Sequence, residues 1–298
     1  MKGAMTLIDA DEAKKLYSKF DKTIECSGGS AANTIAGLAS LGGSGAFIGK
    51  VHNDHLGEVF RNDINSLGVA FNSLPTLDGA PTATSMILVT PDAERTMMTF
   101  LGASVDLMAK DVDENLIQTS KITYLEGYLW VRPSAKKAFL KACEVAHQID
   151  KKISLSLSDP FCVDRHRDEF RELIEEHVDI LFSNEEEILS LYETSNFNKA
   201  IDYVRGHCEI AAITRGEKGS IVINGDEVSN IKAEPVVKLI DTTGAGDAYA
   251  AGFLFGIAKG QDLIASGHIG SICAAEVVSH MGARPNISLE KLIGKKFS

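Results

Sequence analysis

Short apolar runs alternate with helical patterns through the second half of the chain. Four runs, each a candidate strand, begin about 30 residues apart, at 122–125, 153–157, 179–182 and 210–214. Strands repeating at this interval with helices between them are typical of βαβ units, which form a parallel sheet covered on both faces. Two later helices, one running from Gly244 through apolar residues 250–258 and one from Asp262, complete a predicted α/β architecture.

The first hundred residues follow a different pattern. Residues 5–8, 83–89 and 95–100 have features of period 2 and are separated by turn residues such as Pro91 and Asp92. They predict a small sheet that stands away from the main one. Because no linker or repeat interrupts the chain, we expect one domain over 1–298.

Composition narrows the class of protein. A net charge of −11 argues against a nucleic-acid partner, which needs a basic surface. No stretch reaches the 18 apolar residues of a membrane span, and the five cysteines are widely spaced, as in a reducing compartment. We expect a cytoplasmic enzyme that binds neither nucleic acid nor membrane, as a monomer or homodimer.

The most informative segment is 241–249, Asp-Thr-Thr-Gly-Ala-Gly-Asp-Ala-Tyr. Gly244, Ala245 and Gly246 can present backbone N–H groups at the start of a helix, where an anion is stabilised. Asp247 follows in the first turn. A carboxylate beside a phosphate site is repulsive unless it removes a proton from the attacking hydroxyl, so the segment predicts a small-molecule kinase. The alternative is close helix packing only.

A second glycine-rich segment precedes a predicted helix at 34–40. Gly28 and Gly29 allow close backbone approach, and the amide of Asn33 can both donate and accept hydrogen bonds. This combination suits a polyhydroxyl ligand, although a tight turn capping the helix explains it equally well.

Acidic residues follow the predicted strand at 179–182. Ligands bind at the carboxyl ends of parallel strands, and Asn184 and Glu187 share a face if a helix begins here. They could position the hydration shell of Mg²⁺. The alternative is an acidic first helical turn that is favoured by the helix dipole.

Two further features could bind phosphate groups or neutralise their charge. Thr214, Gly216 and Gly219 lie in a loop between two predicted strands and could hold a nucleotide, although a plain turn would look the same. Arg95 lies in a strand of the first hundred residues, where a long cation could neutralise charge during phosphoryl transfer.

Together and in this order, the motifs resemble the ribokinase-like (phosphofructokinase B-type) family of sugar and nucleoside kinases. The resemblance implies a three-layer α/β/α fold with a mostly parallel sheet and a small β lid, formed by about 1–26 and 80–103. It also implies that Asp247 is the general base and that residues 244–246 form the anion hole. In this family pattern Asn184 and Glu187 organise Mg²⁺, and ATP is held by Asn184, Thr214, Gly216, Gly219, Thr242, Thr243 and Asn286. A requirement for a monovalent cation such as K⁺ stays open.

Within the family, the sequence around the lid is most similar to the bacterial adenosine-kinase-like branch. The segments that carry this similarity are 94–103 and 124–128. An apolar lid suits a purine better than a bare sugar, and we expect it to include Met5, Leu7, Met97, Leu101 and Tyr128. The predicted reaction is ATP-dependent phosphorylation of the 5′-hydroxyl of adenosine or a related nucleoside. A sugar kinase acting on ribose, fructose or a keto-deoxy acid is the alternative, and a nucleotide-binding protein without turnover is a third.

One departure concerns the start of the chain. Members of the family begin with a central strand that carries an Asp for the acceptor hydroxyls, whereas this sequence begins at a predicted lid strand. Removing a central strand would leave neighbouring backbone groups unpaired, at about 1–3 kcal/mol for each buried group. We therefore expect the natural polypeptide to extend upstream by about 25–35 residues, the size of a βα-type unit.

Overall fold

Six strands form the central sheet of the computed structural model, which describes residues 5–21, 23 and 25–296. Their spatial order is β4-β5-β6-β7-β8-β9. Strands β4 to β7 are parallel, whereas β8 and β9 are each antiparallel to the strand before. The four strands predicted from the apolar runs are confirmed within a few residues. The bounds are β4 Ile122–Glu126, β5 Lys152–Ser156, β6 Ile180–Asn184, β7 Ile210–Thr214, β8 Ser220–Asn224 and β9 Glu227–Ile231.

Alternation of side chains along the strands divides the core in two. In β7, Ala211 and Ile213 enter one hydrophobic cluster, whereas Ile210 and Ala212 enter the other. Both faces of the sheet are therefore buried, which is why these strands are apolar throughout.

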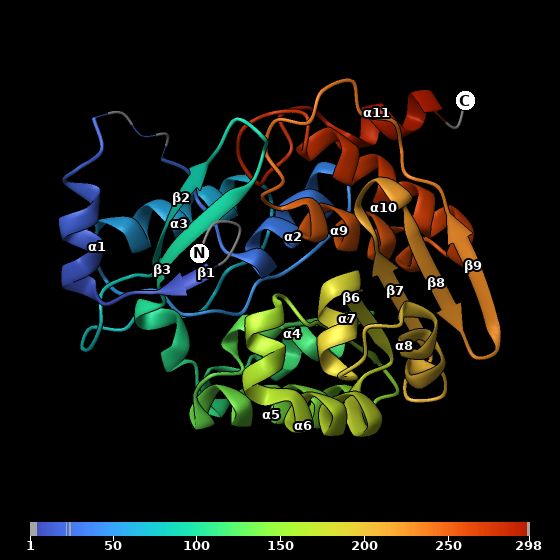
Figure 1. Cartoon of the computed structure of the whole chain (residues 1–298). Helices are drawn as coiled ribbons and strands as arrows, with labels where there is room; N and C mark the ends of the chain where they lie inside the picture. Colours follow the sequence, from blue (N-terminus) through green and yellow to red (C-terminus); the bar gives the residue numbers. More distant parts are fainter. Residues whose placement is uncertain (1–4, 22, 24, 297–298) are drawn as a thin grey trace.

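Helices cover each face and complete the three layers (Figure 1). The side of the first cluster carries α4 Glu114–Thr119, α5 Pro133–His147, α6 Pro160–His177, α7 Glu185–Leu191 and α8 Phe197–Val204. The other side carries α2 Ser30–Ser40, α9 Ala245–Ala258, α10 Leu263–Val277 and α11 Leu289–Lys296. Within the described ranges no helix combines the length and apolarity needed to cross a membrane.

Helix α9 is the centre of the second layer. A Cβ on Gly252 would lie 2.8 Å from backbone atoms of Gly270 on α10, and a Cβ on Gly37 of α2 would lie 2.9 Å from the Cβ of Ala251. The glycines and alanines of this helix therefore allow close packing on two sides. The sequence allowed two explanations for these small residues, close helix packing and a phosphate site. Close packing explains the glycines and alanines in the body of the helix.

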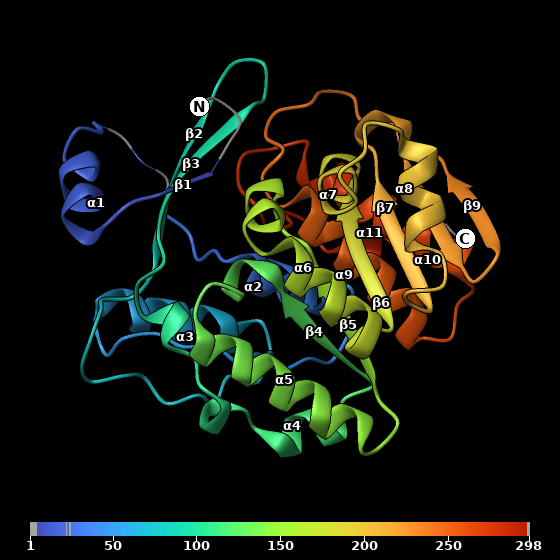
Figure 2. The same ribbon diagram turned by 60° about the horizontal axis from the view of Figure 1, so that its bottom comes forward.

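A three-stranded sheet forms the lid and stands apart from the central sheet (Figure 2). Its order is β1-β3-β2, with β1 parallel and β2 antiparallel to β3. Its strands are β1 Met5–Leu7, β2 Thr84–Val89 and β3 Arg95–Phe100, and helix α1 Ala10–Tyr17 lies beside it. Residues 1–4, 22 and 24 of the expected lid lie outside the described residues.

The remaining elements lie in the connections between these strands and helices. They are helix α3 His55–Ser66 and the single-turn helices η1 Gly102–Asp106, η2 Ala109–Asp111, η3 Gly127–Leu129 and η4 Gly216–Lys218.

Candidate active site

The loop before α9 has the geometry of an anion site. Gly244 caps the helix in the left-handed region at φ 79°, and it offers no side chain for capping. A Cβ on Gly244 would lie 2.5 Å from the carbonyl oxygen of Ala283, so this position requires glycine. The N–H groups at the start of α9 lack helical partners and lie where the helix dipole favours negative charge.

Asp241 holds this loop in place. Its carboxylate accepts hydrogen bonds from the backbone N–H groups of Thr243 and Gly282, each at 2.9 Å, and it is 2% exposed. The two segments that meet at Gly244 and Ala283 are therefore tied by one buried carboxylate. Thr242 and Thr243, predicted to contact ATP, lie in this loop.

Asp247 lies in the first turn of α9 and faces the start of α2. Its Oδ1 accepts a hydrogen bond from Ser30 Oγ at 2.6 Å, and its Oδ2 accepts one from Asn33 Nδ2 at 2.9 Å. Asn33 is held in turn by Arg284, whose Nε donates to Asn33 Oδ1 at 3.3 Å. The two predicted motifs, 214 residues apart at Asn33 and Asp247, thus meet directly.

The surroundings of Asp247 shift its pKa in opposite directions. Burial is the largest influence and raises the pKa of Asp247 above its usual value, and the hydrogen bonds from Ser30 and Asn33 and the positive charge of Arg95 oppose part of this rise. These groups stabilise the charged form that a base needs.

Glu126 is a site residue that the sequence analysis missed as such. It ends β4, is 5% exposed and lies within hydrogen-bond distance of the hydroxyl groups of Ser30 and Ser158. Burial raises the pKa of Glu126 to about 8, and the negative charge of Asp247 adds to the effect. The sequence did contain a sign of it, because an acidic residue directly after a predicted parallel strand lies where ligands bind in such sheets. The same reasoning led to the prediction for Asn184 and Glu187. Ser30, Ser158 and Arg284 were missed as well.

The lid contacts the anion loop. The hydroxyl of Thr242 donates to the carbonyl oxygen of Ala93 at 3.3 Å, and Ala93 lies at the β2–β3 turn with φ 63°. Arg95 begins β3 beside this turn, and its charge opposes the burial that raises the pKa values of Asp247 and Glu187. Arg95 therefore faces the same site as the candidate base.

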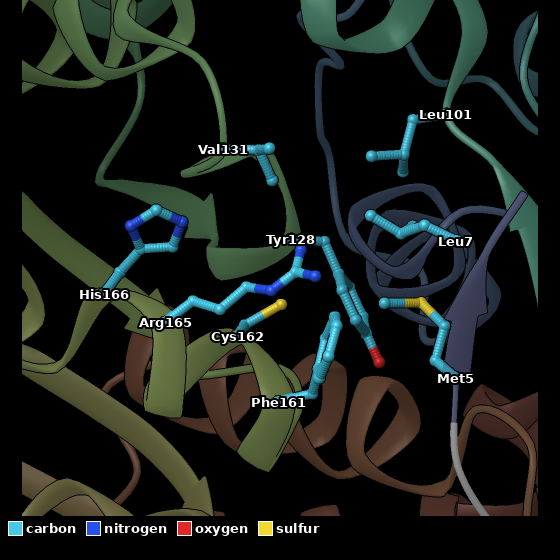
Figure 3. A pocket seen from close by; sticks show the side chains of 9 residues that line it. All are labelled: Met5, Leu7, Leu101, Tyr128, Val131, Phe161, Cys162, Arg165 and His166. Carbon is cyan, nitrogen blue, oxygen red and sulfur yellow. The ribbon is translucent and has the colours of Figure 1, made fainter. Parts of the chain in front are cut away.

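An apolar pocket lies between the lid and the first turns of α6 (Figure 3). Of the five residues predicted for it, Met5, Leu7, Leu101 and Tyr128 line it, whereas Met97 is not among its lining residues and pairs with Met5 across β1 and β3. Five further residues that were not predicted also line the pocket: Val131, Phe161, Cys162, Arg165 and His166. The guanidinium of Arg165 lies 3.9 Å from the ring centre of Phe161.

The other glycine positions are open. Gly29 caps α2 at φ 96°, where a side chain would be strained, and nothing lies within 4 Å of a Cβ built on Gly28 or Gly246. Backbone at these positions is free to approach a ligand closely.

Asn184 and Glu187 form a capping box at the start of α7. Asn184 Nδ2 donates to Glu187 Oε1 at 2.6 Å, and the N–H of Glu187 donates to Asn184 Oδ1 at 2.8 Å. Burial raises the pKa of Glu187 to about 7. No cluster of three or more His, Cys, Asp or Glu suited to a metal occurs in the described part of the chain. This oxygen-rich pair fits Mg²⁺ held through water and phosphate, which is how the ion commonly binds.

The loop after β7 lies beside this capping box. Arg215 forms an ion pair with Glu185 at 3.0 Å, and Thr214 Oγ1 donates to the carbonyl oxygen of Ser183 at 3.4 Å. Gly216 and Gly219 both lie in the left-handed region. Asn286, the last predicted ATP residue, is exposed, and its N–H donates to Glu276 Oε1 at 3.2 Å.

Comparison with known proteins identifies the family. The model of the pfkB family carbohydrate kinases matches residues 4–290. The chain belongs to this family. It is therefore a kinase, a phosphotransferase with an alcohol group as acceptor, and the predicted ribokinase-like fold is confirmed.

Solved structures and curated relatives of this pfkB kinase include both nucleoside and sugar kinases. Adenosine kinase from Sinorhizobium meliloti is 47% identical, with a TM-score of 0.97, and the match covers 99% of this chain and 91% of that one. A probable sugar kinase from Rhizobium etli is 44% identical, with a TM-score of 0.97 and coverage of 100% and 90%. A 5-dehydro-2-deoxygluconokinase from Clostridium beijerinckii is 28% identical, with coverage of 91% and 83%.

Proposed function

We propose that this pfkB kinase transfers the γ-phosphoryl group of ATP to the 5′-hydroxyl of adenosine or a related nucleoside, with Asp247 as general base. The observation that carries the proposal is the position of Asp247 in the first turn of α9. There it lies beside a helix N-terminus without a side-chain cap and accepts hydrogen bonds from Ser30 and Asn33.

The chemistry follows from this arrangement. The acceptor hydroxyl gives its proton to Asp247 as its oxygen attacks the phosphorus, and the bond from phosphorus to the leaving ADP oxygen breaks. Gly244, Ala245 and Gly246 bind the transferred group through backbone N–H groups, and Arg95 neutralises its charge from the lid.

ATP and Mg²⁺ would lie on the side of α7 and the β7–β8 loop. Thr214, Gly216, Gly219, Asn184 and Asn286 would hold the nucleotide together with Thr242 and Thr243. Mg²⁺ would be organised by Glu187 and Asn184 through water, and when bound it neutralises phosphate oxygens.

The lid pocket supports a nucleoside as acceptor. Apolar and aromatic side chains bury a flat base better than a small polyol, and Tyr128 and Phe161 supply rings. The 47% identity to the Sinorhizobium meliloti adenosine kinase supports the same choice.

A sugar-acid acceptor is the second candidate, and Arg165 favours it. Its guanidinium lines the pocket, and a planar guanidinium suits a carboxylate. The 5-dehydro-2-deoxygluconokinase relative makes such an acceptor worth testing.

The test is an acceptor panel with ATP and Mg²⁺. Adenosine, inosine, ribose, fructose and a keto-deoxy sugar acid are compared by ADP release and by the heat stability of the protein at equal ligand concentration. We expect adenosine to give turnover and the largest rise in Tm, because stabilisation grows with ligand concentration over Kd. Turnover and stabilisation by a sugar or sugar acid, without adenosine, would reject the nucleoside assignment.

A further inference from the structure

Three hydrogen bonds join two buried carboxyl groups into one chain. Ser158 Oγ contacts Glu126 Oε1, Ser30 Oγ contacts Glu126 Oε2, and Ser30 Oγ also contacts Asp247 Oδ1 at 2.6 Å. The residues come from four separate parts of the fold: β4, the start of α2, the loop after β5 and the start of α9. The hydroxyl group of Ser30 therefore bridges the carboxyl groups of Glu126 and Asp247.

Counting protons shows that the chain needs one more than the serines supply. Each serine hydroxyl carries a single proton, so Ser30 and Ser158 can serve two of the three contacts. With both carboxyl groups ionised, one contact would bring two oxygen lone pairs together in a buried site, which is strongly unfavourable. One proton on a carboxyl group satisfies all three contacts at once.

The surroundings decide which carboxyl group holds that proton. Asp247 receives a second donor, Asn33 Nδ2, and feels the positive charge of Arg95. For Glu126 the largest influences in the described part of the chain are burial, which raises its pKa, and the negative charge of Asp247, which raises it further. The titratable and charged groups that face the pair are Tyr124 on β4, Tyr128 on η3, Cys162 on α6, Glu187 on α7 and Arg95 on β3.

We propose that Glu126 acts as a protonated carboxylic acid that positions the base: it donates to Ser30, and Ser30 in turn donates to Asp247. All donors then run in one direction, from Ser158 through Glu126 and Ser30 to Asp247. Asp247 keeps its negative charge, with one oxygen fixed by Ser30 and the other by Asn33, and it retains a lone pair for the acceptor hydroxyl. Glu126 is a positioning residue here, because it acts through Ser30. This role rests on the proposed function of Asp247 as base.

The kinetic test uses Glu126→Gln, because a glutamine amide can also donate to Ser30 and accept from Ser158. We expect kcat at pH 7 to fall by less than about tenfold in Glu126→Gln, the effect of one altered hydrogen bond, and by more in Glu126→Ala. In the wild type kcat should also decline above about pH 8, where Glu126 ionises and competes with Asp247 for the Ser30 proton. This alkaline decline should be absent from Glu126→Gln.

A second test needs no substrate, so it separates this inference from the proposed function. A carboxyl group that is protonated in the folded protein but ionised when unfolded releases a proton on unfolding, so stability falls as pH rises between its two pKa values. For Glu126 this window runs from 4.5 to about 8. The Tm of the wild type should therefore fall relative to that of Glu126→Gln across the window. The infrared absorption of protonated carboxylic acids at pH 6 should be weaker in Glu126→Gln than in the wild type, and this difference would report the same group.

Glu169→Gln is the matched control. Glu169 lies on α6. Burial raises its pKa, but the hydrogen bonds with Lys136 and Trp130 outweigh burial, so that its pKa is lowered. The Tm of the wild type should therefore rise with pH relative to that of Glu169→Gln, which is opposite to the change expected for Glu126→Gln. An equal Tm difference at every pH between wild type and Glu126→Gln would overturn the proposal. So would a loss of kcat above about a hundredfold in Glu126→Gln, because Glu126 would then act as an ionised carboxylate.

Discussion

Replacing Asp247 by Asn tests the central chemical assignment with little change of shape. Asp247 Oδ1 lies 2.6 Å from Ser30 Oγ and Oδ2 lies 2.9 Å from Asn33 Nδ2. An asparagine amide can keep both contacts, with its oxygen toward Asn33 and its NH₂ group toward Ser30. Ser30 is then free to donate to Glu126. We therefore expect the variant to fold and to bind ATP nearly as well as the wild type.

The loss should appear in kcat. An amide cannot take up the proton of the acceptor hydroxyl, and general-base catalysis is typically worth about 10²- to 10⁴-fold. Each factor of ten corresponds to about 1.36 kcal/mol, so the barrier should rise by about 2.7–5.4 kcal/mol. Phosphorylation of the acceptor at saturating ATP measures this value, and calorimetry with an ATP analogue measures binding.

A matched control is Asp262→Asn. Asp262 also caps a helix, since it accepts from the N–H of Ala265 at 2.7 Å, but this helix is α10 and not the helix that carries Asp247. Its variant should lose at most about 1 kcal/mol of stability and keep wild-type kcat. If Asp247→Asn retained more than about a tenth of wild-type kcat, the base would have to be another group.

Two other substitutions test the groups around the base. Arg95→Ala should lower kcat more than it raises the acceptor KM, because a cation on the lid matters most as charge develops on the transferred group. An effect on KM alone would mean that Arg95 is a binding residue. Gly244→Ala should weaken ATP binding and cost about 1–3 kcal/mol of unfolding free energy, because φ is 79° and the new Cβ would meet Ala283. Chemical denaturation measures the stability and ATP titration the binding. Gly246→Ala, where a Cβ meets open space, is the control for stability alone, and equal stability of the two variants would contradict the reasoning.

Much of the fold could be predicted because its signals are local. The runs at 122–125, 153–157, 179–182 and 210–214 are apolar because both faces of the sheet are buried, and each became a strand. Strand β9 and the lid helix α1 carry weaker patterns. Strand β9 is largely exposed and α1 buries only Ala13, so neither shows a strong apolar signal.

The site was harder to predict because its decisive contacts are distant in sequence. Asn33 and Asp247 each lie in a recognisable motif, but that they bond to one another follows only from the packing of α2 on α9. Glu126 is a single acidic residue at the end of an apolar strand, and its sequence neighbours give no reason to expect a second carboxyl group nearby. The sequence left open whether Asn33 contacts a ligand or belongs to a turn, and it gave no sign that its amide is held by Asp247 and Arg284.

The lid connects the two halves of the proposed reaction. Its strand β1 supplies Met5 and Leu7 to the acceptor pocket, while its β2–β3 turn reaches the anion loop through Ala93 and Thr242. A kinase must keep water from the phosphoryl group while the acceptor is in place, and closure of a lid serves that purpose. Because one small sheet touches both the pocket and the anion loop, the proposed function predicts that filling the pocket and covering the phosphate are coupled. Since Arg95 begins β3 beside that turn, we expect its charge to reach the phosphate together with closure of the acceptor side.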